Sequence, residues 1–207
     1  ARQRVELRDQ HTCVVFSGDI GRPDDPIMNP PTPLEGADYL VLESTYGNRL
    51  HQPVRIAVAR LEELVRSVHA RGGKIIVPAF ALGRTQELVY VLHQLTDQGR
   101  IPRLPIYVDS PLATNITEVF TRHPEEYDEE SWEDFGKRGD LPLSFRNLTY
   151  VLTREESKLL NTKPGPFIVI SASGMCEAGR IQHHLINCIG DKKNIILITG
   201  FQAQNTL

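Results

Sequence analysis

The chain has 207 residues, of which 40% are hydrophobic, enough to form one domain with a substantial core or one domain and part of another. Its formal net charge of −3, from 23 basic and 26 acidic residues, excludes a generally basic surface as the basis of nucleic-acid binding. Three cysteines without a C-x-x-C pair, and no apolar run near ~18 residues, favour a cytoplasmic protein that does not span a membrane.

Two short apolar strands near the start of the chain end in acidic residues. Residues 14–16 lead into Ser17-Gly18-Asp19, and residues 39–42 lead into Glu43. Between them, residues 21–33 hold five of the 14 prolines, which predicts a loop. A carboxylate at the end of a buried strand is a common way to present a metal ligand or a proton carrier, so Asp19 and Glu43 are candidate catalytic residues.

From about residue 45 the pattern changes to alternating helices and strands. Apolar residues at three- and four-residue steps predict a helix over 54–68, and further helices are expected at 88–95, 113–121, 155–161 and 178–189. Strands are expected at 74–78, 105–109, 148–153, 167–172 and 194–199. This alternation implies βαβ crossovers, and therefore an α/β fold with a mainly parallel sheet flanked by helices.

Three strand-to-helix turns carry residues suited to phosphate binding. They contribute Arg84, Ser110 and the pair Ser173-Gly174, and Arg180 follows the last of them. Open α/β sheets bind ligands at the carboxyl ends of their strands. A helix N-terminus after Ser173-Gly174 would also favour an anion. These turns therefore predict contacts with a phosphate backbone.

Each basic candidate also has a structural alternative. Arg84 can pair with Glu87, and Arg180 can pair with Glu177 on its own helix. The strand-end acid Asp109 would repel a phosphate, so a structural role is expected for it. Glycine-rich turns between strands and helices also often serve close packing.

Adjacent residues on a helix point to different faces, so His183 and His184 cannot form a paired metal-ligand set. One of them is expected to pack against the protein, and the other to face solvent or the cleft.

The ordered motifs resemble those of the metallo-β-lactamase-fold nucleic-acid hydrolases of the β-CASP family. The likeness is strongest to RNA-cleaving members related to the 73-kDa endonuclease of the mRNA cleavage and polyadenylation factor. It covers nearly the whole chain and is carried by Ser17-Gly18-Asp19, Glu43-Ser44-Thr45-Tyr46-Gly47, Pro78 to Leu88, Asp109-Ser110-Pro111, Ser173-Gly174-Met175 with Gly179-Arg180-Ile181, and Thr199-Gly200-Phe201-Gln202.

The resemblance implies a domain organisation. Residues 1–44 would be a partial metallo-β-lactamase αββα segment, and residues 45–199 a β-CASP domain. Residues 200–207 would begin the return to the metallo-β-lactamase domain.

The resemblance also implies a zinc-dependent nuclease that hydrolyses RNA phosphodiester bonds. Asp19 matches the aspartate that bridges two zinc ions, and Glu43 matches the acidic residue called motif A. The β-CASP part would hold the RNA strand over the metal site, with Arg84, Ser110, Ser173, Gly174 and Arg180 as its contacts. Single-stranded DNA is not excluded as a partner, and a homodimer is left open.

Two parts of the family pattern do not occur in the sequence. There is no His-x-His-x-Asp-His, and the two histidines expected after Gly200-Phe201-Gln202 are not reached before Leu207. We therefore expect the chain to be the middle of a larger enzyme. Because a hydrolytic zinc site needs several converging ligands, we expect the isolated chain to be inactive and to hold zinc weakly.

Two other functions stay open on the sequence alone. One is a non-catalytic α/β module that binds a nucleotide or phosphate, since the same strand-end turns would serve it equally well. The other is a catalytically inactive interaction subunit of the same family.

Overall fold

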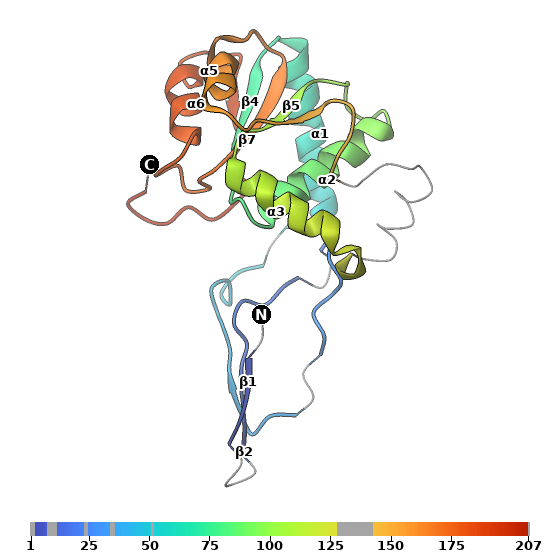
Figure 1. The fold of residues 1–207 in the computed structure, drawn as a ribbon, viewed down its shortest axis with the longest axis vertical. Coiled ribbons are helices and arrows are strands. Elements are labelled where there is room, and N and C mark those ends of the chain that lie inside the picture. Colours follow the sequence, from blue (N-terminus) through green and yellow to red (C-terminus); the bar gives the residue numbers. More distant parts are fainter. Residues whose placement is uncertain are drawn as a thin grey trace.

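The computed structural model describes residues 3–7, 12–22, 25–33, 36–50, 52–127 and 143–206. These residues form two sheets, one of three strands and one of five. In Figure 1 the three-stranded sheet lies apart from the body of the molecule, which contains the five-stranded sheet and the helices.

The three-stranded sheet places two loops that carry acidic residues at the same end of its strands. Strand β1 (Gln3–Leu7) pairs antiparallel with β2 (Thr12–Phe16), and β2 pairs parallel with β3 (Tyr39–Val41). Because β2 and β3 run in the same direction, the chain leaves both of them at the same end. Asp19 follows β2 and Glu43 follows β3, so the two predicted carboxylates emerge side by side.

Part of the predicted loop 21–33 anchors the N-terminal segment to the body. The Ile27 side chain is 2% exposed and belongs to the main hydrophobic core. Met28 forms an isolated antiparallel bridge with Tyr127, and the Asn29 N–H donates to the Glu126 carbonyl at 3.1 Å. This stretch therefore packs as part of the body.

The five-stranded sheet is parallel throughout, as the sequence predicts. Its order is β6-β5-β7-β4-β8, and every neighbouring pair is parallel. The strands are β4 (Lys74–Pro78), β5 (Ile106–Val108), β6 (Leu148–Tyr150), β7 (Phe167–Ser171) and β8 (Ile195–Ile196). The central strand β7 is buried at every residue, which explains its unbroken apolar sequence.

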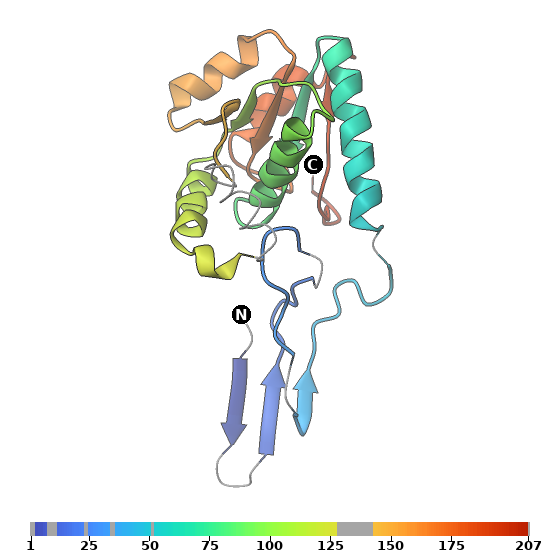
Figure 2. The same ribbon diagram turned by 90° about the vertical axis from the view of Figure 1, so that its right-hand side faces the viewer.

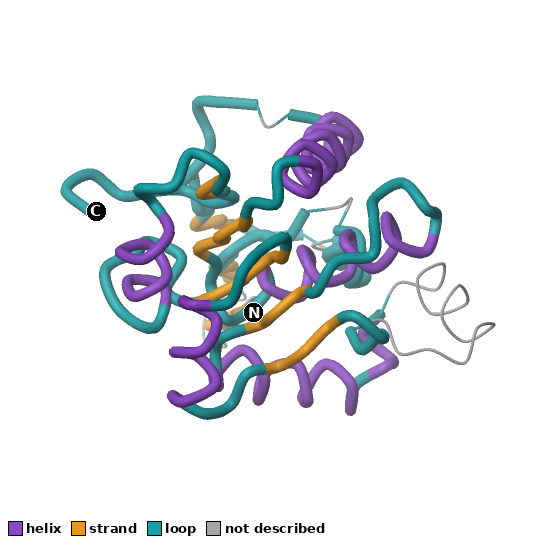
Figure 3. Tube along the Cα trace, turned by 90° about the horizontal axis from the view of Figure 1, so that it is seen from above, coloured by secondary structure: helices purple, strands orange, loops and turns teal. Residues whose placement is uncertain are grey.

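Helices cover both faces of this sheet (Figures 2 and 3). Along β7, Ile168 and Ile170 pack in the larger core cluster, whereas Phe167 and Val169 pack in the smaller one, as the two-residue period of a strand requires. The larger cluster lies under α1 (Val54–Ala70), α2 (Arg84–Asp97) and α3 (Pro111–Arg122), and the smaller under α5 (Arg154–Thr162) and α6 (Ile181–Cys188). A short 3-10 helix spans Pro124–Glu126. No helix in the described ranges combines the length and apolar character needed to cross a bilayer.

The predicted elements are confirmed, but several are shorter than expected. Strands β6 and β8 end before residues 153 and 199, and α6 begins at Ile181 instead of residue 178. The late start of α6 has a backbone cause, because Cys176 and Gly179 have φ of 63° and 85°. A right-handed helix cannot pass through left-handed residues.

The connection that follows β7 lies on the opposite face of the sheet from the connections that follow its two neighbouring strands, β4 and β5. The chain leaves β4 and β5 toward α2 and α3, whereas it leaves β7 toward α6 on the other face. Such a reversal separates the loops and opens a crevice at the carboxyl ends of the strands, where open α/β sheets bind ligands. The loops after β4, β5 and β7 are therefore the place to look for a site.

Candidate nucleic-acid site

The two acidic loops of the N-terminal sheet are held together by hydrogen bonds. The Ser17 hydroxyl donates to the Gly18 carbonyl at 2.7 Å and accepts the Glu43 N–H at 3.0 Å. The Glu43 carboxylate accepts the N–H groups of Ile20 at 3.3 Å and Thr45 at 3.2 Å. These hydrogen bonds, that from Ile20 first and then those from Thr45, lower the pKa of Glu43 below its ordinary value.

Asp19 directly precedes Ile20, so the predicted catalytic carboxylates share one loop cluster. Asp19 is exposed, whereas Glu43 is partly buried and its carboxylate accepts the N–H of Thr45, two residues along the chain. Within the described residues, no three His, Cys, Asp or Glu side chains gather as a metal site. A hydrolytic zinc centre needs at least about three protein ligands. The described residues therefore fit part of such a centre and do not form one by themselves.

The loops after β4, β5 and β7 are joined around the central strand. The Ser171 hydroxyl donates to the Asp109 carbonyl at 2.9 Å, and the Ala79 N–H donates to the Ser171 carbonyl at 3.0 Å. Ser110 caps α3, because its hydroxyl accepts the Ala113 N–H at 3.2 Å, and Pro111 occupies the first helical turn. Ser110 and the residues after β7 thus lie at adjacent strand ends.

The Ser173-Gly174 turn is tightly packed. A Cβ atom on Gly174 would lie 2.9 Å from Cδ2 of Phe80 and 3.0 Å from its backbone nitrogen, so only glycine fits this position. The Gly174 carbonyl accepts the side-chain amide of Gln202 at 2.8 Å. Close packing, the structural alternative for this turn, is therefore present. It does not exclude the partly buried Ser173 side chain from binding a ligand.

One argument made from the sequence for this turn is wrong. The Ser173-Gly174 pair does not lie at the N-terminus of a helix, because Met175 to Arg180 separate it from α6. The favourable effect of a helix dipole on an anion falls off within the first turn. Any anion at this turn would be held by hydroxyl and backbone N–H groups alone.

Arg180 is bound to a buried carboxylate of another strand. Its Nη1 donates to Oδ1 of Asp109 at 2.6 Å and to the Val151 carbonyl at 3.2 Å, and its Nη2 donates to the Leu152 carbonyl at 2.8 Å. The partner is therefore Asp109, and the sequence-based alternative of Glu177 is wrong. A residue just before α6 reaches back to β5 because the two segments meet at the carboxyl edge of the sheet.

Asp109 is the centre of a buried polar network. Its side chain is fully buried, and its Oδ2 contacts Nε2 of His184 at 2.6 Å and accepts the Ser157 hydroxyl. Burial acts to raise the pKa of Asp109. The hydrogen bonds from His184, Ser157 and Arg180 outweigh burial and hold the pKa below its ordinary value. The structural role predicted for Asp109 agrees with this geometry.

His184 ties the same network to α5. Its Nδ1 lies 2.9 Å from Oδ1 of Asn161, and its side chain is 1% exposed, whereas His183 is exposed. The expected division between one packed and one solvent-facing histidine is confirmed. The contact between His184 and Asp109 could not be predicted from the sequence, because the two residues lie on different elements far apart in the chain.

Arg84 lies outside this network. Its Nη1 donates to Oε2 of Glu87 at 2.6 Å, which is the i, i+3 pair that the sequence offered as the alternative. Its guanidinium lines a separate cavity between α1 and α2. Arg84 therefore lies at the same end of the sheet as Ser110 and Ser173, but it lines a cavity that those two residues do not line.

A chain of contacts joins the two acidic loops to the turn after β7. Tyr46, three residues after Glu43, packs edge-to-face on Phe201 with ring centroids 6.3 Å apart. The next residue, Gln202, donates to Gly174. The candidate residues thus belong to two sheets, which are linked through Phe201 and Gln202. The candidate residues therefore follow parallel strands of two separate sheets.

We expect Gly179→Ala to destabilise the site's longest loop. Gly179 has φ of 85°, and a Cβ atom there would lie 2.4 Å from the Ala172 carbonyl oxygen. Positive φ and a backbone clash together should lower the free energy of unfolding by about 2–4 kcal/mol. The matched control is Gly190→Ala, where a Cβ atom meets nothing within 4 Å. Urea unfolding checks this, and equal stabilities of the two variants would contradict it.

The fold and these motifs were compared with known proteins. A family model described as the Beta-Casp domain matches residues 85–207. The chain belongs to the β-CASP family. The family resemblance carried by the motifs is thereby confirmed, together with the α/β class and its mainly parallel sheet.

The similar proteins include ribonucleases. This β-CASP chain is 38% identical over 203 residues to Ribonuclease TTHA0252 of Thermus thermophilus, covering 98% of the chain and 46% of that protein. Endoribonuclease YSH1 of Saccharomyces cerevisiae is 29% identical over 199 residues, covering 94% of the chain and 25% of that protein. The RNase J-like protein of Methanocaldococcus jannaschii is 29% identical over 198 residues, covering 94% and 44%. The chain thus spans less than half the length of these relatives.

Proposed function

We propose that the protein to which this chain belongs is a metal-dependent nuclease that hydrolyses RNA phosphodiester bonds. The observation that carries the proposal is the set of loops at the ends of β4, β5 and β7, joined through Phe201 and Gln202 to the carboxylate loops of Asp19 and Glu43. The ribonucleases among its relatives support the substrate class.

The β-CASP part would hold the RNA backbone at the strand ends. Ser110 and Ser173 are the proposed hydroxyl contacts at adjacent loops, although Ser110 is buried and its hydroxyl already caps α3. Gly174 keeps the turn close to the sheet. Arg84 and Arg180 are the proposed cationic contacts, although each already has a carboxylate partner. Arg180 would then act mainly by holding the loop after β7 in place, with one guanidinium edge left to meet a phosphate.

The carboxylate loops are proposed to form part of the metal centre. Asp19 would provide one oxygen ligand of zinc, and Glu43 would fix the loop that carries it through the Ile20 N–H. Zinc bound there would supply an activated water and stabilise negative charge. The other ligands would come from the rest of the whole protein. The free thiols of Cys13, Cys176 and Cys188 support the proposed cytoplasmic location.

The test is a cleavage assay on the whole protein with labelled RNA and single-stranded DNA of the same sequence. We expect cleavage of RNA that is lost after dialysis against a chelator and restored by zinc. The isolated chain should be inactive and should retain no stoichiometric zinc in elemental analysis. Cleavage that survives metal removal would overturn the proposed metal dependence. Two tightly bound zinc ions in an isolated chain that cleaves RNA would overturn the proposal that this chain supplies only part of the metal centre.

A further inference from the structure

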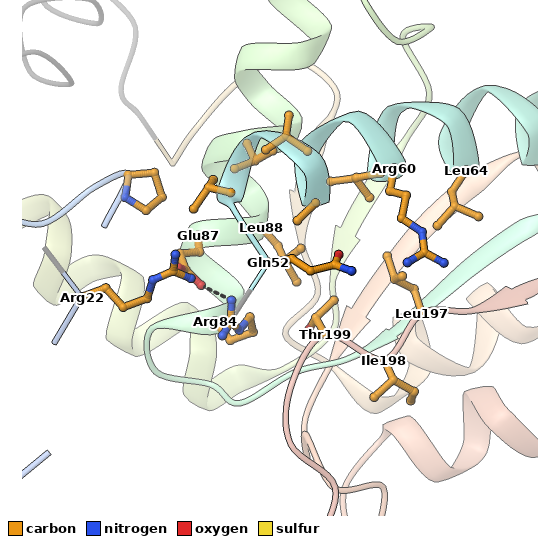
Figure 4. Close-up of a pocket in the computed structure, with 16 residues that line it drawn as sticks. Arg22, Gln52, Arg60, Leu64, Arg84, Glu87, Leu88, Leu197, Ile198 and Thr199 are labelled. Carbon is orange, nitrogen blue, oxygen red and sulfur yellow. Dashed lines mark hydrogen bonds and ion pairs between the residues drawn. The ribbon is translucent and has the colours of Figure 1, made fainter. Parts of the chain in front are cut away.

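A cavity of about 460 Å³ lies between α1 and α2, next to the chain that follows β8 (Figure 4). Its walls are mainly aliphatic, and the lining includes Val58, Leu61, Leu64, Leu88, Val91 and Leu197. Neither Ser110 nor the Ser173-Gly174 turn lines it, so it is distinct from the loops at the ends of β5 and β7. Small-molecule sites have volumes of roughly 300–1,000 Å³, and this cavity falls within that range.

The charged side chains around the cavity favour an anion. Among the described residues that line it, these are Arg22, Arg60 and Arg84 against the acid Glu87, an excess of two formal positive charges. In Figure 4 Arg22, Arg84 and Glu87 lie at one end of the view and Arg60 at the other. Glu87 is paired with Arg84 at 2.6 Å. Arg60 has no hydrogen-bond or ion-pair partner in the described part of the chain, so it is the cation available to a ligand.

Polar groups occupy the middle of the cavity. The hydroxyl oxygen of Thr199 is buried and finds no hydrogen-bond partner among the described residues. The Gln52 side chain, which lies between the two charged ends in Figure 4, supplies an amide donor and acceptor. A buried polar atom without a partner costs free energy, and a ligand that hydrogen-bonds to Thr199 would remove this cost.

We propose that this cavity binds a nucleoside monophosphate, either free or as the terminal nucleotide of an RNA strand. The phosphate lies at Arg60, the base packs on the aliphatic walls, and Gln52 and Thr199 hydrogen-bond to polar groups of the nucleoside. The proposal rests on the proposed function, because RNA hydrolysis produces both mononucleotides and new strand ends. It adds a second nucleotide site, separate from the strand-end crevice.

The test is calorimetric titration of the protein with AMP, UMP, adenosine and inorganic phosphate, in the presence of EDTA so that hydrolysis does not contribute. We expect both mononucleotides to bind more tightly than adenosine or phosphate alone. Arg60→Ala should weaken AMP binding by about 10-fold or more, because it removes a charge-assisted contact. The matched control is Arg55→Ala, an exposed arginine of α1 that does not line the cavity and should bind AMP normally.

A second variant tests the apolar wall. Ala57 lines the cavity from α1, so Ala57→Trp should fill it and abolish AMP binding while circular dichroism shows an intact fold. Arg60 is exposed and has no partner among the described residues, so Arg60→Ala should fold normally. The test therefore stays decisive even if the tryptophan variant does not fold. Failure of AMP and UMP to bind at millimolar concentration would overturn the proposal. Equal affinities of the Arg60→Ala and Arg55→Ala variants would overturn it as well.

Oligoribonucleotides with and without a terminal 5′-phosphate separate the two sources of the ligand. Tighter binding of the phosphorylated strand, lost in Arg60→Ala, supports a site for RNA ends, whereas binding of mononucleotides alone supports a free ligand. RNA cleavage is measured separately with zinc restored. Cleavage without nucleotide binding overturns the cavity proposal alone, and nucleotide binding without cleavage overturns the nuclease proposal alone.

Discussion

Replacing Arg180 by alanine is expected to lower the free energy of unfolding by about 3–5 kcal/mol. The change removes the only guanidinium bound to Asp109 among the described residues and leaves that fully buried carboxylate with His184 and Ser157. Two backbone carbonyls, of Val151 and Leu152, also lose a donor. Urea unfolding at neutral pH measures the effect.

The control is a pair of the same kind on the surface. Arg122 lies 3.7 Å from Glu118 on α3, with both side chains largely exposed, so Arg122→Ala should cost less than about 1 kcal/mol. Similar losses in the two variants would show that the Asp109 pair contributes no more than a surface pair.

Acid should reduce the difference between the unmodified protein and Arg180→Ala. The pKa of Asp109 is lowered in the folded state, so its contribution to stability is fully present above the ordinary aspartate pKa of about 3.9 and is lost as pH falls below it. The unfolding free energies of the two proteins should therefore converge as the pH falls from neutral into the acid range.

Salt titrations of RNA affinity test whether Arg180 also touches RNA. If it does, the salt dependence of binding should be shallower for Arg180→Ala by about one phosphate contact, and equal slopes for the two proteins exclude that contact.

Asp19→Asn in the whole protein should reduce RNA cleavage by about 10²–10⁴-fold while leaving stability within about 0.5 kcal/mol. Asp19 is exposed, so the stability of the folded chain should not depend on its charge. Its proposed role as a metal ligand or proton carrier does require the charged carboxylate. The amide keeps the shape of the side chain and removes only its charge. Single-turnover cleavage of labelled RNA, with elemental analysis of zinc, gives the two readouts.

The matched control for Asp19 is Glu63→Gln. Glu63 is an exposed acid of α1 outside both the carboxylate loops and the strand-end crevice, so its neutralisation should leave cleavage unchanged. An Asp19→Asn protein that cleaves RNA within about threefold of the unmodified rate would remove Asp19 from the proposed metal centre. A similar loss in both variants would point to a general effect of charge.

Features that depend on local sequence could be predicted well. The apolar stripe of 54–68 produced helix α1, and the apolar run 167–172 produced the buried strand β7, because side-chain period determines which face is buried. Pro111 at the start of α3 and Ser110 as its cap follow from the same local chemistry. The ordered motifs were sufficient to indicate the family.

Features that depend on tertiary contacts could not be predicted in this way. The structural alternative that the sequence offered for Arg180 was the nearby Glu177. A guanidinium binds the carboxylate that the fold brings to it, and here that is Asp109 on another element. The start of α6 was placed too early because a glycine adopts either helical or left-handed backbone, so the sequence does not show that Gly179 has a positive φ. The cavity between α1 and α2 arises from the spacing of two helices, which no single helix encodes.

The Asp109 network has a consequence for how this half of the molecule would open. It joins the end of β5 to α5 through Ser157, to α6 through His184, and to the start of α6 through Arg180. These segments cannot fray one at a time without exposing the same buried carboxylate, so they form a single cooperative unit. The Ser173-Gly174 turn lies between β7 and α6, inside that unit. Its order is therefore set by the free energy of opening the whole unit, and a ligand there would meet a preorganised loop.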